Sequence, residues 1–235
     1  MTLEERATLA FQFRYHILRR ASRHAAPRIL DLGCGPKHPY YVRLLFPNAV
    51  YTAVDLLPFD SLPARTRVAI DHYRRVDLGA EGLAGLAEGR FDVIILSHIL
   101  EHLLNGLEVL DQACWRLAPD GVVYCEYPRV ASTRMPSAYG TLNFWDDPTH
   151  VRLYSQVEIL NVMTANGIRV EAFGVRRFWP RIAIAPVRVL HSLITERRLR
   201  GGDLWDLFGF AEYALGRRPG RAGAPAGPSP EGAHL

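Results

Sequence analysis

The sequence predicts an α/β domain whose mostly parallel sheet is covered by helices on both faces. Short apolar runs alternate along the chain with segments of helical periodicity. The runs are apolar at consecutive positions, which indicates strands that are buried on both faces. The length of 235 residues, 49% of them hydrophobic and 22% charged, fits one folded domain with a substantial core. We place this single domain at residues 1–218.

The first predicted element is an N-terminal helix over residues 2–24. Thr2 and Glu5 have the spacing of a capping box, and apolar residues follow at helical intervals. The next apolar run, at residues 28–32, is predicted to be a buried strand. It leads directly into Gly33-Cys34-Gly35, and the two glycines indicate a tight turn there.

The rest of the chain continues the alternation of strands and helices. A second capping box, Ser155 to Glu158, begins a helix that we expect to end near Gly167. Pro119-Asp120-Gly121 is expected to form a turn before a strand. The predicted strands are 49–54, 73–76, 91–96, 122–126, 168–175 and 210–215, and the predicted helices are 40–46, 107–117 and 155–166.

Two segments do not follow this alternation of strands and helices. Residues 128–152 have little periodicity and many aromatic and polar side chains. A loop of this length within a compact domain is commonly functional. Residues 219–235 are rich in Gly, Pro and Ala and have few large apolar side chains to offset the entropy of ordering, so we predict a disordered tail.

Charge and cysteine usage exclude several classes of protein. The net charge of +4 is too small to imply a polyanionic partner, and we expect no nucleic-acid partner. The three cysteines show neither paired spacing nor a CxxC motif, so we expect no disulfide framework and no zinc cluster. The first residues lack the pattern of a secretory signal, and no apolar stretch is long enough to span a bilayer. These features favour a cytoplasmic protein.

The most informative residues lie where the first two strands end. Ligands of an open parallel sheet bind at the carboxyl ends of its strands, where glycines let the backbone approach a cofactor closely. Asp55 comes 20 residues after Gly35, where a carboxylate can accept both hydroxyls of an adenosine ribose. A dinucleotide fingerprint would have a third glycine where this sequence has His38. Asp31 would be poorly placed against a pyrophosphate and well placed near a cation, which favours S-adenosylmethionine.

Five motifs in order resemble the class I S-adenosylmethionine-dependent methyltransferases. They are Ile-Leu-Asp-Leu-Gly-Cys-Gly at 29–35, Asp55, Asp77-Leu78, the run 91–102 and Leu-Ala-Pro-Asp-Gly at 117–121. The resemblance covers residues 27–175 and resumes at the final strand. It implies a Rossmann-like class I methyltransferase fold with a seven-stranded, mostly parallel sheet and an antiparallel last strand. The parts would be a cofactor-binding core at 27–127, an acceptor loop at 128–152 and a C-terminal part at 153–218.

The resemblance also assigns roles to individual residues of the cofactor site. It implies Asp31, Gly33 and Gly35 at the methionine end of the cofactor, Asp55 at the ribose, Asp77 and Leu78 at the adenine, and Ser97 and His98 near the sulfonium. The sequence departs from the family pattern at Lys37, where a third glycine is frequent. Lys37 either pairs with the methionine carboxylate or is a solvated lysine.

Methyl transfer from a sulfonium is an in-line displacement that needs positioning and a base. We predict His150 as that base or as an anchor for the acceptor, and His98 as a second catalytic candidate. Glu101 and His102 resemble a recurrent Glu-His pair of the family, but such a pair also serves as structural hydrogen bonding.

Several histidines and aspartates of the sequence are potential ligands of a divalent metal. His98, His102 and His150, with Asp146 and Asp147 as carboxylates, would supply enough ligands, but their spacing matches no compact metal motif. We therefore expect no metal site.

The loop 128–152 also carries candidates for binding the acceptor. Aromatic and apolar side chains could wall it, namely Met135, Tyr139, Phe144 and Trp145. The forked donors of Arg129, Arg134 and Arg152 would suit a carboxylate or phosphate, or else the arginines are solvated. Residues 181–200 interleave apolar residues with arginines, which fits either peripheral contact with an anionic membrane or a helix packed on the sheet or on a second copy.

The sequence thus predicts an enzyme that transfers a methyl group from S-adenosylmethionine, leaving S-adenosylhomocysteine. The expected acceptor is an oxygen or nitrogen of a small metabolite, sugar or lipid-linked glycan. No Asn-Pro-Pro-Tyr-like motif follows the fourth strand, which argues against methylation of DNA bases. Two alternatives are a non-catalytic cofactor-binding partner protein and, less favoured, a nicotinamide-dependent reductase. The sequence makes no prediction of the oligomeric state.

Overall fold

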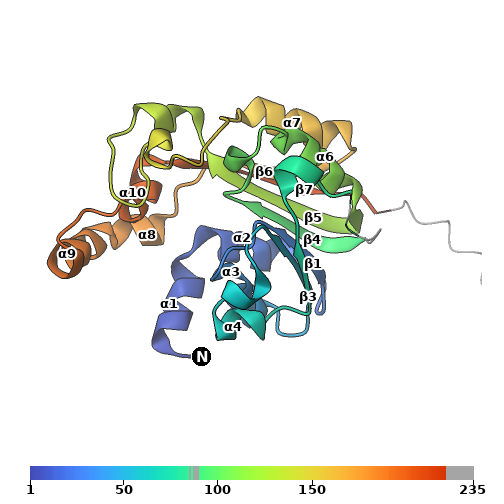
Figure 1. Ribbon diagram of the computed structural model, residues 1–235, viewed down its shortest axis with the longest axis horizontal. Coiled ribbons are helices and arrows are strands. Elements are labelled where there is room, and N and C mark those ends of the chain that lie inside the picture. Colours follow the sequence, from blue (N-terminus) through green and yellow to red (C-terminus); the bar gives the residue numbers. More distant parts are fainter. Residues whose placement is uncertain (85, 87–89, 221–235) are drawn as a thin grey trace, which may run out of the picture.

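The computed structural model describes residues 1–84, 86 and 90–220 (Figure 1). Seven strands form one sheet in the order β3-β2-β1-β4-β5-β7-β6. Their bounds are β1 Arg28–Leu32, β2 Val50–Asp55, β3 His72–Arg75, β4 Phe91–Ser97, β5 Leu117–Pro128, β6 Arg169–Val175 and β7 Ala211–Arg217. β7 runs antiparallel to both of its neighbours and all other pairs are parallel. The predicted fold, including its antiparallel last strand, is confirmed.

Helices cover both faces of the sheet, so the molecule has three layers (Figure 1). One face carries α6 (Gly106–Trp115) and α7 (Gln156–Ala165), and the other carries α2 (Phe13–Ala21) and α3 (His38–Leu45). Successive residues of a strand point to opposite faces. In β1, Leu30 packs in the core under α6 and α7, whereas Ile29 packs in the core under α2 and α3. The consecutive apolar runs of the sequence therefore reflect two cores on either side of one sheet.

The remaining elements are short or lie outside these layers. The helices are α1 Leu3–Phe11, α4 Ala64–Arg67, α5 Leu78–Glu81, α8 Trp179–Ala183, α9 Ala185–Glu196 and α10 Gly201–Phe208. The 3-10 helices are η1 Phe59–Ser61, η2 Leu100–His102, η3 Val130–Arg134 and η4 Phe144–Asp146. Among the described residues, none of these helices combines the length and the apolar character needed to cross a membrane.

The N-terminal helix predicted over 2–24 is in fact two helices. The predicted capping box is present, because the Thr2 side chain accepts from the Glu5 N–H and Glu5 accepts from the Thr2 N–H. The chain then breaks at Gln12, whose φ of −106° and ψ of 117° are extended. The break lets α2 lie on the sheet while α1 contacts α3, where the Tyr40 hydroxyl donates to Glu5 Oε1 at 2.6 Å.

Other parts of the chain also differ from the prediction. The expected turn at residues 119–121 lies within the bounds of β5, where Asp120 has a φ of 62° and the pairing with β4 shifts register. Helices α4, α5 and α10 were not predicted. The predicted tail 219–235 is described only at its first two residues, and 221–235 lie outside the described residues.

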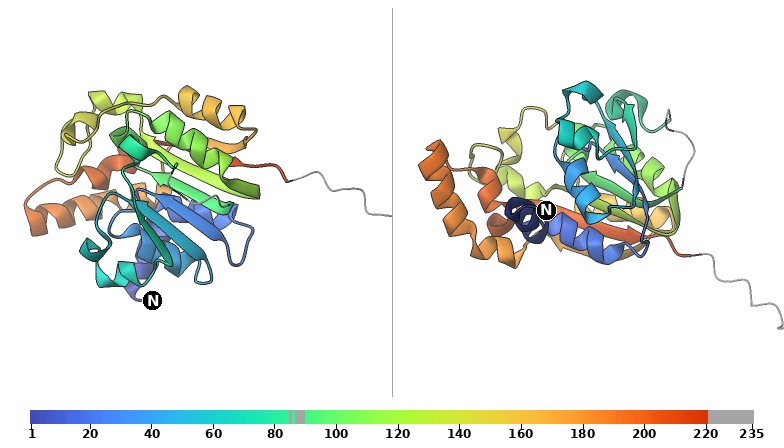
Figure 2. Two further views of the ribbon diagram at one scale, coloured as in Figure 1. Left: turned by 45° about the vertical axis from the view of Figure 1, so that its right-hand side comes forward. Right: turned by 90° about the horizontal axis from the view of Figure 1, so that it is seen from below.

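The loop 128–152 and helices α8–α10 lie together at one edge of the sheet (Figure 2). This is the edge where the parallel strands β1, β2, β4 and β5 have their carboxyl ends, because the loop continues directly from β5. Helices α8–α10 connect the carboxyl end of β6 to the start of the antiparallel β7, which also lies at this edge. The topology therefore gathers both segments where an open sheet binds its ligands.

Candidate active site

Asp31 lies at the centre of the cofactor side of the site. It is buried, and its Oδ2 accepts hydrogen bonds from His38 Nδ1 at 2.7 Å and from the Tyr51 hydroxyl. Its other oxygen, Oδ1, is buried and has no hydrogen-bond partner in the described part of the chain. Buried carboxylate oxygens are normally satisfied, so Oδ1 is suited to accept from a ligand, and a cationic amino group would fit best.

The turn after β1 needs its two glycines for different reasons. Gly33 and Gly35 have φ values of 68° and 60°, in the left-handed region that favours glycine. A Cβ atom on Gly33 would lie 2.6 Å from Ile99 Cδ1, so close packing excludes a side chain there. A Cβ atom on Gly35 would meet no atom within 4 Å, so open space adjoins the backbone. This open backbone is where a cofactor can approach.

A cavity of about 370 Å³ lies beside this turn. It is bordered by residues of the turn and by residues of α1, α2 and α3, among them Gly35, Lys37, Arg14 and Tyr15. Lys37 is exposed and lines this cavity, as a pairing with a carboxylate of the cofactor requires.

Two further aspartates stand at the ends of neighbouring strands. Asp55 ends β2, and it accepts from the N–H of Gly35 at 2.7 Å and from the N–H of Leu57 at 3.0 Å. Asp77 follows β3 and is exposed, and its Oδ1 caps α5 by accepting from two backbone N–H groups. Leu78 is buried in the core beneath α5. Asp31, Asp55 and Asp77 thus mark the same edge of three adjacent strands.

Ser97 and His98 follow at the end of β4. Ser97 Oγ is buried without a partner among the described residues. His98 has a φ of 55° and both of its ring nitrogens face carboxylates: Nδ1 lies 2.9 Å from Glu101 Oε1 and Nε2 lies 2.8 Å from Glu126 Oε1. Burial alone would lower the pKa of His98, but the hydrogen bonds to Glu101 and Glu126 raise it. With a proton on each nitrogen, His98 is suited to position carboxylates rather than to remove a proton.

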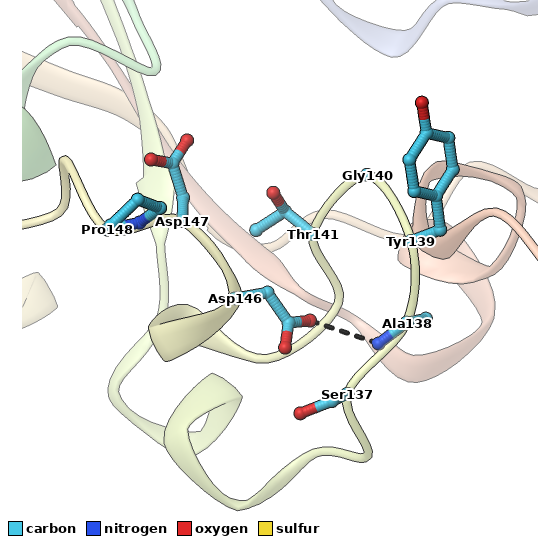
Figure 3. A pocket seen from close by; sticks show the side chains of 8 residues that line it. All are labelled: Ser137, Ala138, Tyr139, Gly140, Thr141, Asp146, Asp147 and Pro148. Atoms are coloured by element: carbon cyan, nitrogen blue, oxygen red, sulfur yellow. Dashed lines mark hydrogen bonds between the residues drawn. The ribbon is translucent and has the colours of Figure 1, made fainter.

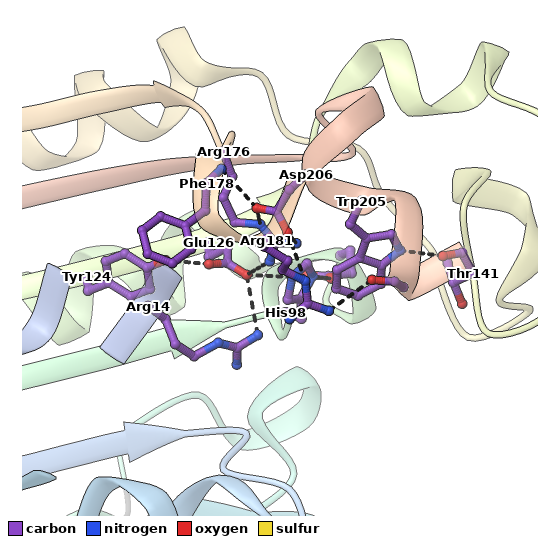
Figure 4. A network of polar contacts seen from close by, with 12 residues as sticks. Arg14, His98, Tyr124, Glu126, Thr141, Arg176, Phe178, Arg181, Trp205 and Asp206 are labelled. Atoms are coloured by element: carbon purple, nitrogen blue, oxygen red, sulfur yellow. Dashed lines mark hydrogen bonds and ion pairs between the residues drawn. The ribbon is translucent and has the colours of Figure 1, made fainter. Parts of the chain in front are cut away.

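A buried network of charges joins the two sides of the site (Figure 4). Glu126, fully buried in β5, accepts from Arg176 at 2.8 Å, from Arg14 of α2 at 3.4 Å and from the Tyr124 hydroxyl. Burial raises the pKa of Glu126, but the charges of Arg176, Arg14 and His98 outweigh burial and hold that pKa well below its ordinary value. The network therefore contains an ionised Glu126 at neutral pH.

The same network reaches the C-terminal helices. Asp206 of α10 lies 3.2 Å from the Arg176 guanidinium and 3.1 Å from that of Arg181 of α8. Neither Glu126 nor Asp206 was predicted as a residue of the site. One signal was available for Glu126, because a charged residue that interrupts an apolar strand at its carboxyl end is unusual.

On the acceptor side, the fold brings His102 and His150 together. Their ring centroids are 4.9 Å apart, although one follows β4 and the other ends the loop 128–152. His150 Nδ1 donates to the Phe144 carbonyl at 2.7 Å, and its Nε2 lies 3.9 Å from Asp147 Oδ2. Because a carbonyl only accepts, Nδ1 holds the proton and Nε2 of the neutral ring keeps its lone pair. The predicted His150 therefore has a nitrogen free to act as a base or a ligand.

A cavity of about 620 Å³ lies in the loop 128–152 (Figure 3). Residues 137–141 and 146–148 line it, so Asp147 is part of its wall. Asp146 also shapes the loop, since its Oδ2 accepts from the N–H groups of Ala138, Leu142 and Asn143.

The predicted wall of the acceptor pocket is only partly present. Tyr139 lines the cavity, whereas Phe144 is buried against the His150 ring and Trp145 is 66% exposed. Arg152 bonds to Glu158 and to the Leu104 carbonyl, so it supports the loop.

The sequence of residues 4–172 matches a family model described as a methyltransferase domain. The chain therefore belongs to the class I S-adenosylmethionine-dependent methyltransferases, and S-adenosylmethionine is its cofactor. The unpartnered Asp31 Oδ1 and the open backbone at Gly35 are consistent with that cofactor. No curated protein matches the sequence.

Solved structures share the fold at low sequence identity. An S-adenosylmethionine-dependent methyltransferase from Mesorhizobium loti is 19% identical, with a TM-score of 0.60 over 89% of this chain and 100% of that one. The N-methyltransferase NodS from Bradyrhizobium japonicum is 16% identical, with a TM-score of 0.55 over 91% and 99%. NodS has also been solved with S-adenosyl-L-homocysteine. The [4+2]-cyclase SpnF, 17% identical, matches with a TM-score of 0.52 over 88% and 81%, so this fold alone does not define the reaction.

Proposed function

We propose that the protein methylates an oxygen or nitrogen of a small metabolite, sugar or lipid-linked glycan. The observation that carries this proposal is the placement of His150, whose Nε2 keeps its lone pair near the wall of the loop cavity. That cavity opens at the edge of the sheet where the cofactor turn also lies. A nucleophile held there would approach a methyl donor bound at the ends of β1, β2 and β4.

The cofactor side is proposed as follows. Asp31 Oδ1 accepts from the amino group of the cofactor, Gly33 closes the turn against Ile99, and the open backbone at Gly35 leaves room for the methionine part. Asp55 binds the ribose, Asp77 and Leu78 border the adenine, and Ser97 lies near the sulfonium. S-adenosylmethionine supplies an activated methyl group when bound. The residues therefore need to bind and orient it rather than to activate it further.

On the acceptor side, His150 either removes the proton of the nucleophile or anchors the acceptor. In the first role, the proton passes to Nε2 and the nearby Asp147 stabilises the resulting imidazolium. His98, which we predicted as a second catalytic candidate, has both nitrogens bound to carboxylates. We propose that it positions Glu101 and Glu126.

The first test is cofactor binding by the purified protein. Thermal unfolding with S-adenosylmethionine, S-adenosylhomocysteine or NADH compares the three candidate ligands directly. A ligand at 100 times its dissociation constant stabilises the folded state by about 2.7 kcal/mol, which raises the unfolding midpoint measurably. We expect stabilisation by the two S-adenosyl ligands alone. Stabilisation by NADH alone would indicate a reductase and contradict the proposal.

The second test is methyl transfer itself. Radiolabelled S-adenosylmethionine is offered with panels of hydroxylated metabolites, amines, sugars and lipid-linked glycans, and label in the product is counted. Label in one class, lost with His150→Ala, supports the proposal. Cofactor binding without transfer to any of these classes would favour the non-catalytic alternative.

We also propose that α9 contacts an anionic membrane peripherally. Val187, Leu190 and Ile194 are 70%, 58% and 70% exposed and lie on one face of α9, which projects from the molecule (Figure 1). Arginines 197 and 198 follow this apolar face and are exposed. Apolar side chains next to arginines are typical of helices that lie in the interface of an anionic bilayer.

Vesicle binding tests this contact. We expect wild-type protein to sediment with anionic phosphatidylglycerol vesicles and not with phosphatidylcholine vesicles, and Leu190→Glu to abolish sedimentation. The matched control is Val157→Glu, which alters an exposed residue of α7. Equal sedimentation of the Leu190 variant would contradict the contact. The three cysteines are buried free thiols, which is consistent with the cytoplasmic location that we propose.

A further inference from the structure

Three potential metal ligands converge beside the loop cavity. One ligand atom each of Glu101, His102 and His150 lies within 4.8 Å of the other two. The first two belong to η2, directly after β4, and the third ends the loop 128–152. The backbone fixes this arrangement, because the Glu101 carbonyl accepts from the N–H groups of Val151 at 2.8 Å and Arg152 at 3.3 Å. The spacing of these residues along the sequence did not predict the cluster, because only the fold brings η2 and the loop together.

Both histidines present Nε2 as the nitrogen that is free to bind. In His150, Nδ1 donates to the Phe144 carbonyl. In His102, Nδ1 lies 2.9 Å from Thr149 Oγ1, which itself donates to Asp147 Oδ1 at 2.6 Å. That hydroxyl therefore accepts from His102, and Nδ1 carries the proton. Metal-binding histidines are typically held in this way, with the second nitrogen donating to a neighbouring oxygen.

Glu101 supplies an independent sign of a missing ligand. It is 2% exposed, and its Oε1 is bonded to His98. Its Oε2 is buried and has no hydrogen-bond partner among the described residues. An unsatisfied buried carboxylate oxygen is costly, and a cation bound beside it would remove that cost.

We propose that Glu101, His102 and His150 bind one divalent metal ion that holds the methyl acceptor. Two imidazole nitrogens and one carboxylate favour Zn²⁺, Mn²⁺ or Fe²⁺ over Ca²⁺ and Mg²⁺, and they leave coordination positions open. A suitable space adjoins the cluster, because Asp147 lines the loop cavity and accepts from the Thr149 hydroxyl, which bonds to His102. The role of the metal in holding the acceptor rests on the proposed methyl transfer. The binding of the metal by these three residues does not.

The metal defines the class of acceptor as a hydroxylated compound, best of all one with two neighbouring hydroxyls that can chelate. Coordination lowers the pKa of a bound hydroxyl, so its proton leaves to water and an alkoxide remains. The alkoxide oxygen forms a bond to the methyl carbon as the carbon–sulfur bond breaks. The electron pair of that bond stays on sulfur, which gives S-adenosylhomocysteine and the methyl ether. His150 then serves as the anchor of the acceptor through the metal and not as the base.

Metal binding to the full-length, tag-free protein tests the proposal. The protein is stripped with EDTA and titrated with Zn²⁺ and Mn²⁺ by calorimetry, and with Co²⁺ by visible absorption. We expect one ion per chain. His102→Ala and His150→Ala should each weaken binding by more than the roughly 10–100-fold that loss of an outer-shell partner costs, and Thr149→Val by about that amount. His24→Ala, at an exposed histidine between α2 and β1, is the matched control and should bind as wild type does.

Folding and cofactor binding are measured on the same samples. Thermal unfolding of each metal-free variant shows that it is folded, and Glu101→Gln, which keeps the shape of the side chain, is a third ligand variant. Absence of binding by folded wild-type protein, or equal affinity in the ligand variants and the control, would overturn the metal site. S-adenosylhomocysteine binding by metal-free protein is scored separately, so failure of the metal site and failure of the proposed methyl transfer are distinguishable.

Discussion

The cofactor side and the acceptor side of this site are built in different ways. On the cofactor side, Asp31, Gly33, Asp55 and Ser97 each lie in the last positions of a strand or directly after it. On the acceptor side, His102 and His150 meet only because a loop end bonds to η2. A motif in the sequence can locate residues of the first kind, since the sheet alone fixes their position. Residues of the second kind depend on contacts between distant segments.

This difference predicts that the two sides can be damaged separately. The largest separate effect is expected from His150→Ala. Loss of a base or of an acceptor anchor should lower turnover by about 10²–10⁴-fold. Binding of S-adenosylhomocysteine should stay unchanged, because His150 contacts Phe144 and Asp147 rather than the turn after β1. Initial rates with the identified acceptor measure the first effect, and an unchanged rate would remove His150 from catalysis.

Substitution of Glu126 tests whether the buried network that joins the two sides stabilises the fold. Glu126→Ala removes one of the two carboxylate partners of the buried Arg176 and leaves only Asp206. Breaking a buried ion pair from one side costs about 3–5 kcal/mol, so we expect a loss of that size in the free energy of unfolding by urea. Glu4→Ala, at an exposed residue of α1, is the control. A loss no larger than that of the control would show that the network does not stabilise the fold.

Alanine substitutions of Gly33 and Gly35 compare two positions within the cofactor side. Each alanine variant should cost about 1–2 kcal/mol in unfolding free energy, because an L residue is strained at these positive φ values. Gly33→Ala should cost more, since its Cβ atom would meet Ile99. Gly35→Ala should instead weaken cofactor binding, since its Cβ atom would enter the space left for the cofactor. Urea unfolding and calorimetry with S-adenosylhomocysteine separate the two, and equal effects of both variants on both measurements would contradict this assignment.

The smallest expected effect is a decrease in the free energy of unfolding at low pH. The charges of Arg176, Arg14 and His98 outweigh burial and hold the pKa of Glu126 well below the 4.5 of an unfolded chain. The stabilisation by ionised Glu126 is therefore complete above that pH and is lost as the pH falls below it. One such group contributes a slope of about 1.4 kcal/mol per pH unit. Glu126→Gln should remove that part of the slope, and an identical acid dependence in the variant would contradict it.

Most of the sheet could be predicted because its apolar runs are bounded by turn residues. The carboxyl ends of β1, β2 and β4, where the predicted cofactor residues lie, agree with the prediction within one residue. The break at Gln12 could not be predicted, because helical periodicity continues through it and tertiary packing causes it. The Glu126 network, the partners of Asp31 and the meeting of His102 with His150 also depend on packing. No local pattern in the sequence encodes them.

The central claim is that one side of the site binds S-adenosylmethionine and the other acts on the acceptor. Calorimetry with S-adenosylhomocysteine on wild-type protein, Asp55→Ala and His150→Ala tests it most directly. Asp60→Ala, at an exposed residue of η1, is the control for Asp55. Loss of two hydrogen bonds to a carboxylate should weaken binding to Asp55→Ala by at least about 100-fold. The His150 variant and the control should bind as wild type does. Tight binding to Asp55→Ala, or loss of binding in His150→Ala, would contradict the account.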